Sequence, residues 1–246
     1  MLGSGPAGRG PHPPSAHPYR RALRSAEAGG GTHATAEYLL LLAELEATTG
    51  GGPEAVYPLL DRAARLYLTL DDATGLATVT LQRGELAAQH GDRTVARLLL
   101  QDAAERLRQL GDPAGAARAQ LALGRLALTG GSPDAAIAAL VDALRTFHQV
   151  GDRDRQATTL EHLAMASRDP VRAATLLGAA AALRQAGTAV VPPADRARLA
   201  ETVQRARREL DPAEFELASE RGRSRTVAET VRFACFPDRP ARRPPG

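Results

Sequence analysis

The chain has 246 residues, of which 43% are hydrophobic, enough apolar material for one or two folded domains. Only 3% of the residues are aromatic, no tryptophan occurs, and the single isoleucine is Ile137, so strand-forming residues are scarce and the composition indicates an all-α protein. The net charge of +3 divides unevenly along the chain and leaves residues 34–193 mildly acidic. No single face is forced to be strongly basic, and we therefore expect no direct nucleic-acid binding.

Residues 1–33 are rich in Gly, Pro, Ser and His and show no sustained periodicity. We expect a flexible N-terminal segment with one short helix over Tyr19–Ala28. Its GSGPAG, Gly3–Gly8, matches the dinucleotide fingerprint, but no strand can precede it and PHPP follows, so we expect no cofactor there. We also expect no export signal and no membrane span, because the apolar runs are short. The single cysteine, Cys235, fits a cytoplasmic protein.

Residues 34–190 repeat with a period of forty. QLGDP, which starts at Gln109, is echoed by QVGDR at Gln149 and by TLDDA at Thr69. Apolar residues recur at the same register in each period: Leu60, Leu100 and Leu140; Ala63, Ala103 and Ala143; Tyr67, Leu107 and Phe147; Leu70, Leu110 and Val150. Each period therefore predicts a pair of helices, and because one pair cannot bury both of its faces, we expect the pairs to stack into a solenoid. About three and a half hairpins are predicted, the last shortened by an early turn over 167–170.

The Gly-Asp-Pro sequence within the repeat marks the end of one helix and the start of the next. Gly111 can end one helix in the left-handed conformation, Asp112 can cap the next, and Pro113 suits its first position. Parts of the same device recur at Gly131-Ser132-Pro133, Asp169-Pro170 and Asp211-Pro212, and capping-box spacing joins Asp211 to Glu214 and Thr226 to Glu229. Capping therefore explains these Asp residues without a catalytic role.

The spacing of Leu123-Gly124, Ala136, Leu140 and Ala143 resembles the tetratricopeptide repeat signature. The segment 172–234 resembles the one that closes the repeat region of actinobacterial LuxR-type and STAND ATPase transcriptional regulators. This resemblance implies a tetratricopeptide-like solenoid, wound as a right-handed superhelix, with a C-terminal helical cap over 191–234 and a disordered Pro/Arg-rich tail over 235–246. In those regulators an ATPase domain precedes the repeats and a helix-turn-helix often follows. We recognise neither here, and without lysine no P-loop motif is possible.

Catalytic and metal-binding constellations are missing from the sequence, so we expect no enzyme, no cofactor and no metal. The six histidines are scattered, Cys235 has no local base, and no serine stands in a G-x-S-x-G context. Binding is instead expected in the concave groove lined by the first helix of each hairpin. By the register this groove includes Thr78, Glu85, Gln89, Arg118, Arg125, Thr129 and His162. Their mixed charge suits a protein or peptide partner, and a merely solvated helix face is the alternative.

The leading functional hypothesis is a non-catalytic protein-interaction or signal-sensing module of a bacterial transcription-regulatory system of the LuxR/STAND type. The alternative is a solenoid receptor that binds a small ligand or peptide in its concave groove. The basic run Glu201–Asp211 does not indicate nucleic-acid binding, because interspersed acids such as Glu201, four residues before Arg205, predict a helix with intrahelical ion pairs.

Overall fold

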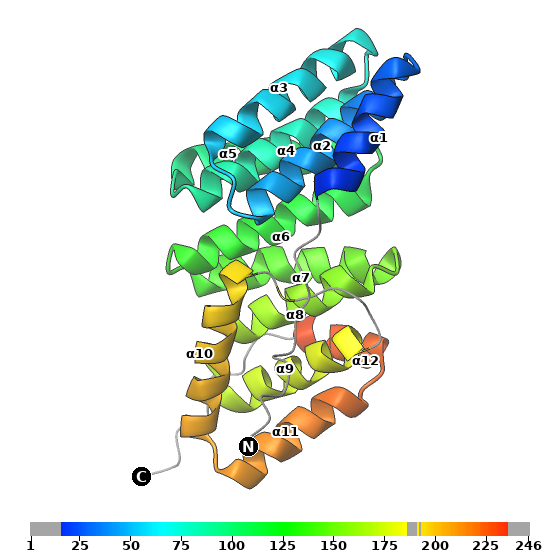
Figure 1. The fold of residues 1–246 in the computed structure, drawn as a ribbon. Coiled ribbons are helices and arrows are strands. Elements are labelled where there is room, and N and C mark those ends of the chain that lie inside the picture. The colour runs from blue at the N-terminus through cyan, green and yellow to red at the C-terminus, as the bar shows by residue number, and fades with distance from the viewer. Residues whose placement is uncertain (1–15, 186–190, 192, 236–246) are drawn as a thin grey trace, which may run out of the picture.

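The fold is all-helical in a computed structural model that describes residues 16–185, 191 and 193–235 (Figure 1). No strand occurs in these residues, which confirms the predicted fold class. The helices are α1 (Ala16–Ala28), α2 (Thr32–Thr48), α3 (Pro53–Thr69), α4 (Ala73–Gln89), α5 (Arg93–Gln109), α6 (Pro113–Thr129), α7 (Pro133–Gln149), α8 (Arg153–Ala166), α9 (Pro170–Gln185), α10 (Pro193–Glu209), α11 (Pro212–Ser224) and α12 (Val227–Cys235).

Consecutive helices from α2 to α9 pack as hairpins, and the hairpins stack in series (Figure 1). The period of forty separates the starts of α4, α6 and α8, at Ala73, Pro113 and Arg153. Each helix from α2 to α7 has 17 residues, whereas α8 has 14 and ends at Ala166. The predicted shortening of the last hairpin is therefore present.

The N-terminal helix α1 is longer than the one expected over Tyr19–Ala28 and packs against α2. Leu23 contacts the apolar cluster of α2, α3 and α4. Two ion pairs add to this contact, Arg20 to Glu46 at 2.7 Å and Arg62 to Glu27 at 2.5 Å. A packed helix thus occupies the second half of the segment expected to be flexible, while residues 1–15 lie outside the described residues.

The core consists of the repeat positions that the sequence pattern selects. The leucine and alanine columns, Leu60, Leu100 and Leu140 with Ala63, Ala103 and Ala143, are all fully buried. The aromatic or leucine column, Tyr67, Leu107 and Phe147, is buried as well. The fourth column differs, because Leu70, Leu110 and Val150 are the C-cap residues of α3, α5 and α7 and remain 39–46% exposed.

The turns contain the left-handed glycine and the capping aspartate that the sequence predicts. Gly111 has a φ of +76°, and the Asp112 side chain accepts a hydrogen bond from the Gly115 amide at 2.8 Å. The side chains of Asp72, Asp92 and Asp152 cap α4, α5 and α8 in the same way, and both predicted capping boxes form. Ser132 is the exception, since it stands at the N-cap of α7 but its side chain makes no capping hydrogen bond.

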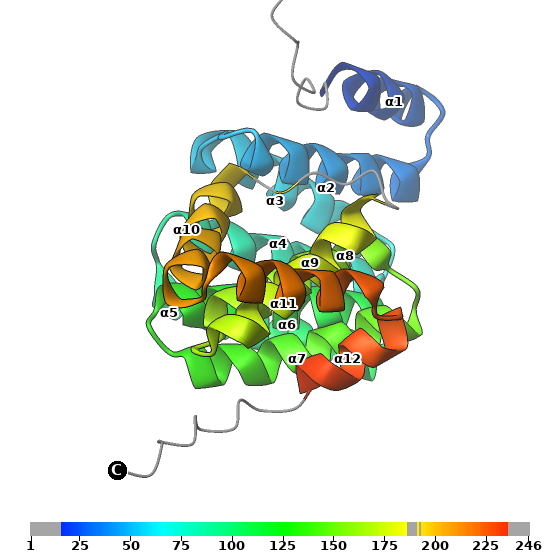
Figure 2. The same ribbon diagram turned by 90° about the horizontal axis from the view of Figure 1, so that it is seen from below.

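The last three helices close the stack, as Figure 2 shows from below. α11 packs against α9 so tightly that a Cβ added to Gly178 would lie 2.0 Å from the Ser219 carbonyl oxygen, and one added to Gly222 would lie 2.0 Å from that of Thr175. α12 packs on α7 and α9, where the guanidinium group of Arg172 donates to the last carbonyls of α12, at Phe233 and Ala234. Helices α10 to α12 thus cover the predicted cap region, and of the predicted tail only Cys235 lies within the described residues.

Asp71 offers a test of the turn chemistry, because it has a φ of +54° at the repeat position that Gly111 occupies one period later. A side chain in this region costs about 1 kcal/mol relative to glycine. Asp71→Gly should therefore raise the free energy of unfolding by about 1 kcal/mol, and the reciprocal Gly111→Asp should lower it by a similar amount. Urea denaturation followed by circular dichroism measures both, and a loss of stability in Asp71→Gly would contradict the assignment.

Gly178→Ala should destabilise the cap, because the new methyl group meets the backbone of α11 and no side-chain rotation can relieve the clash. We expect a loss of about 3 kcal/mol, at the upper end of overpacking costs, together with faster hydrogen exchange in α11. The matched control is Gly29→Ala, where the added Cβ would lie 3.4 Å from the Ser25 carbonyl oxygen, an ordinary contact. Equal unfolding midpoints for the two variants would show that α11 does not approach α9 this closely.

Candidate functional site

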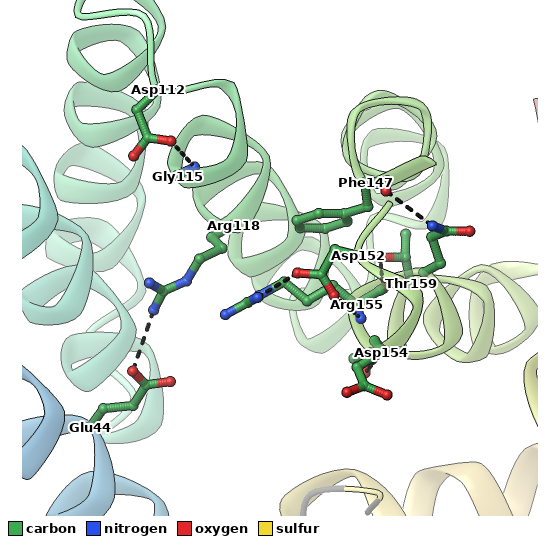
Figure 3. Close-up of polar contacts among 11 residues, drawn as sticks. Glu44, Asp112, Gly115, Arg118, Phe147, Asp152, Asp154, Arg155 and Thr159 are labelled. Atoms are coloured by element: carbon green, nitrogen blue, oxygen red, sulfur yellow. Dashed lines mark hydrogen bonds and ion pairs between the residues drawn. The ribbon is translucent and has the colours of Figure 1, made fainter. Parts of the chain in front are cut away.

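The first helices of the hairpins, α2, α4, α6 and α8, lie next to one another in succession and form one surface, which we call the inner face. Arg118 on α6 reaches Glu44 on α2, with 3.7 Å between its Nη2 and the Glu44 Oε2, although α4 lies between these helices in the stack (Figure 3). Side chains from two non-adjacent helices can meet in this way only if the helices converge on that side. The inner face is therefore concave, as expected for stacked hairpins.

All seven predicted groove residues lie on the first helices. The structure places Thr78, Glu85 and Gln89 on α4, Arg118, Arg125 and Thr129 on α6, and His162 on α8. Glu85 interacts electrostatically with Arg118, Arg125 and Glu44, and Arg118 also forms the ion pair with Glu44. These four charged side chains from α2, α4 and α6 are called the charge cluster below.

The three remaining polar residues of α4 and α6 contribute less to this arrangement. The hydroxyl of Thr78 donates to the carbonyl of Thr74 at 3.0 Å, and that of Thr129 donates to the carbonyl of Leu126 at 2.9 Å. Both hydroxyls are thus used within their own helices. Gln89 is exposed at the last residue of α4, so the structure does not bring it into the charge cluster.

Glu85 is the most perturbed member of the charge cluster. Burial raises the pKa of this carboxyl above its ordinary value, and the charge of Glu44 raises it further. The positive charges of Arg118, Arg125 and Arg155 act in the opposite direction without cancelling the effect of burial. Arg155 itself holds Asp152, whose carboxylate both caps α8 and accepts from the Arg155 guanidinium at 2.5 Å (Figure 3).

His162 is buried, with 3% of its surface exposed, and its partner comes from outside the repeats. Its Nε2 lies 3.4 Å from the Oδ1 of Asp195, in the first turn of α10. Its Nδ1 lies 2.8 Å from the carbonyl oxygen of Thr158, an atom that can only accept a hydrogen bond. Both ring nitrogens therefore face oxygen atoms that accept hydrogen bonds.

Asp195 is the functional candidate that the sequence did not reveal. Its Oδ1 also lies 3.5 Å from Nη2 of Arg125, so one carboxylate contacts both α6 and α8. Burial by itself would raise the pKa of Asp195, but the hydrogen bond with His162 and the positive charge of Arg125 hold it below its ordinary value. Arg125 and Asp195 are 70 residues apart in the sequence, and they meet only because α10 crosses the stack. No local sequence pattern predicts this contact.

A second, tighter ion pair lies beside this contact. The Arg184 guanidinium on α9 holds both carboxylate oxygens of Glu161 on α8, at 2.6 and 2.7 Å, and also donates to the Thr158 hydroxyl at 3.0 Å. The hydrogen bonds to Glu161 raise the pKa of Arg184. The fork-shaped pair is buried and joins the two helices of the last hairpin, so its role is structural.

A separate depression of about 680 Å³ lies between α5 and α7, with α6 at its floor. Arg93, Arg97 and Asp142 contribute charge to its rim, and Leu123 and Ala127 contribute apolar surface. Arg93 already donates to the Thr129 carbonyl at 2.6 Å. Sequence periodicity did not indicate this depression, because its lining residues are unremarkable alanines, leucines and exposed polar residues of three successive helices.

The described residues contain no group of three or more His, Cys, Asp or Glu side chains arranged to hold a metal ion. Over the same residues, none of the helices has the length and apolar content needed to cross a bilayer.

Comparison with known proteins places the chain by its fold. No protein-family model matches it, and no curated protein does so either. Among solved structures the chain is similar to the crystal structure of BtubC (BKLC) from P. vanneervenii, with 19% sequence identity and a TM-score of 0.63. That match covers 93% of this chain and 94% of the other. At this identity the likeness concerns the fold alone, and it supports the helical-repeat architecture over nearly the whole chain.

Proposed function

We propose that this chain is a non-catalytic protein-interaction module whose inner face holds a peptide segment of a partner protein. The fold supports this role, because stacked hairpins expose one long continuous surface on which successive helices each offer a ridge. The more specific part of the proposal is that the partner belongs to a bacterial transcription-regulatory system of the LuxR/STAND type. It rests on the resemblance of segment 172–234 to those regulators.

The observation that carries the proposal is that the inner face keeps one charged side chain, Glu85, that the repeat architecture does not need. Burial raises the pKa of Glu85, which means that its ionised form is less stable there than in water. The position equivalent to Glu85 is Arg125 on α6 and the uncharged Met165 on α8, so the repeat architecture itself does not require a carboxylate. Charges kept at a cost to stability are typical of surfaces used for recognition.

A receptor for a small ligand or peptide is the second candidate. The depression between α5 and α7 favours it, since about 680 Å³ lies within the range of ligand pockets, although this depression is not in the predicted groove. Thermal-shift screening distinguishes the candidates, because a tightly bound small molecule raises the melting temperature by mass action.

Photo-crosslinking in the native host tests the interaction proposal. A photoreactive amino acid replaces Thr78 on the inner face of α4 or, as the matched control, Leu98 of α5, whose side chain is 60% exposed. We expect a crosslinked partner from position 78 and none from position 98. Charge reversal by Arg118→Glu should reduce the crosslink yield at least about fivefold, because it places a third acid beside Glu44 and Glu85.

The identity of the crosslinked protein distinguishes a general interaction module from a partner in a regulatory system. A crosslinked protein with a DNA-binding or ATPase domain, identified by mass spectrometry, supports the regulatory system. A captured protein of another kind, still dependent on Arg118, supports an interaction module without that system. Equal crosslinking from positions 78 and 98, or capture that Arg118→Glu leaves unchanged, contradicts binding at the inner face.

Glu85→Gln tests whether the inner-face charge costs stability. A carboxyl whose pKa is raised by folding favours the native state at low pH and loses that contribution as the pH rises through the folded pKa. Glutamine does not titrate, so the variant should equal the wild type near pH 4 and exceed it in free energy of unfolding at pH 7. Urea denaturation across this range measures the difference, and a variant less stable than the wild type at pH 7 would show that Glu85 supports the fold.

A further inference from the structure

Helix α10 does not belong to the repeats and lies across them, as Figure 1 shows. It contacts α8 and α9, and its first turn carries Asp195 to Arg125 of α6 and His162 of α8. Toward its other end the guanidinium of Arg205 donates to the Ser167 carbonyl at 2.8 Å. A segment of the chain's own C-terminal cap therefore occupies part of the inner face.

The contact that Asp195 makes is loose for a buried carboxylate. Its two polar neighbours stand at 3.4 and 3.5 Å, whereas the adjacent Arg184–Glu161 pair is held at 2.6 and 2.7 Å. The Asp195 side chain is nine-tenths buried, yet its Oδ2 finds no hydrogen-bond partner among the described residues. Leaving such an oxygen without a donor is unfavourable. The buried surroundings of Asp195, which include Arg125 of α6 and His162 of α8 and are called the recess below, therefore do not fit this side chain well.

The recess itself is equipped for a carboxylate. Arg125 presents its guanidinium from α6 and remains 37% exposed, and His162 presents Nε2 from α8. Arg184 of α9 and Arg198 of α10 add positive charge around the same point, while Asp154 and Glu161 supply the negative charge nearby. Arg118, two turns before Arg125 on α6, lies 3.7 Å from Glu44 and also interacts electrostatically with Glu85.

We infer that the recess between α6 and α8 is a subsite for an acidic side chain of the partner segment, and that Asp195 of α10 occupies it while the partner is absent. This inference rests on the proposed function and specifies the chemistry of its partner. The occupant is a peptide segment that carries an aspartate or glutamate as α10 does. On the side of α2 the charge cluster presents the carboxylates of Glu85 and Glu44. The partner segment therefore carries a basic residue on that side.

Competition between α10 and the partner regulates the affinity of the inner face. The cap keeps Asp195 at a high local concentration, because α11 is packed against α9. A partner therefore binds with its intrinsic affinity reduced by the fraction of chains whose recess is open. Any change that weakens the Asp195 contact should strengthen binding of an acidic segment.

Fluorescence anisotropy with full-length protein tests this competition. The probe is a fluorescein-labelled peptide that copies residues 193–201, PADRARLAE, and the control peptide carries asparagine in place of its aspartate. The variant Asp195→Asn keeps the shape of the side chain but removes its charge. We expect the acidic probe to bind Asp195→Asn about tenfold more tightly than the wild type, since a hydrogen-bonded charge contact is worth at least this factor. The asparagine peptide should bind Asp195→Asn much more weakly than the acidic probe does, because it lacks the charge that Arg125 would contact.

The double variant Asp195→Asn with Arg125→Gln is the matched control for the subsite. It should lose the preference for the acidic over the asparagine peptide, while circular dichroism shows the same helix content as the single variant. Equal affinity of the two peptides for Asp195→Asn, an acidic preference that survives Arg125→Gln, or no binding at millimolar peptide would overturn the inference.

The two proposals fail in different ways. Crosslinking from position 78 that depends on Arg118, together with a negative peptide result, leaves an interaction surface without an acidic subsite. A positive peptide result without crosslinking leaves an anion-binding recess that no protein partner uses in the cell, and this combination contradicts the proposed function.

Discussion

Close approach of neighbouring helices is the constraint on which the rest of the structure depends. Glycine and alanine columns allow it, since Gly84 faces Leu100 and Gly124 faces Leu140 with no room for a further methyl group. Because a single hairpin exposes too much apolar surface, each one is completed by the next. Serial stacking on this pattern brings the first helices together, and their convergence creates the concave inner face.

Two kinds of buried charge lie side by side in the last hairpin and differ in how well they are satisfied. The Arg184–Glu161 pair uses both carboxylate oxygens and joins α8 to α9. Asp195 instead joins the cap to the repeats through one oxygen and longer contacts. A well-matched pair resists exchange, whereas a poorly matched one can be replaced by a better ligand, so the difference in geometry separates structure from recognition.

Features that depend on neighbouring residues could be predicted from the sequence. The period, the buried columns, the caps at Asp112 and Asp211 and the shortened α8 all follow from helix periodicity and end chemistry. The register also located Glu85 on the inner face. Partners distant in sequence could not be predicted, because Asp195 meets Arg125 only through the path of α10. The position of α1 likewise depends on the contact of Leu23 with the cluster of α2, α3 and α4, to which two ion pairs add.

Crossing of the stack by α10 also has a mechanical consequence. In an array of hairpins each unit touches only its neighbours, so the end units can open singly. Helix α10 contacts α6, α8 and α9 at once and thereby holds together hairpins that would otherwise separate one by one. The C-terminal half should therefore open as a single cooperative block, while the hairpins from α2 to α5 fray stepwise.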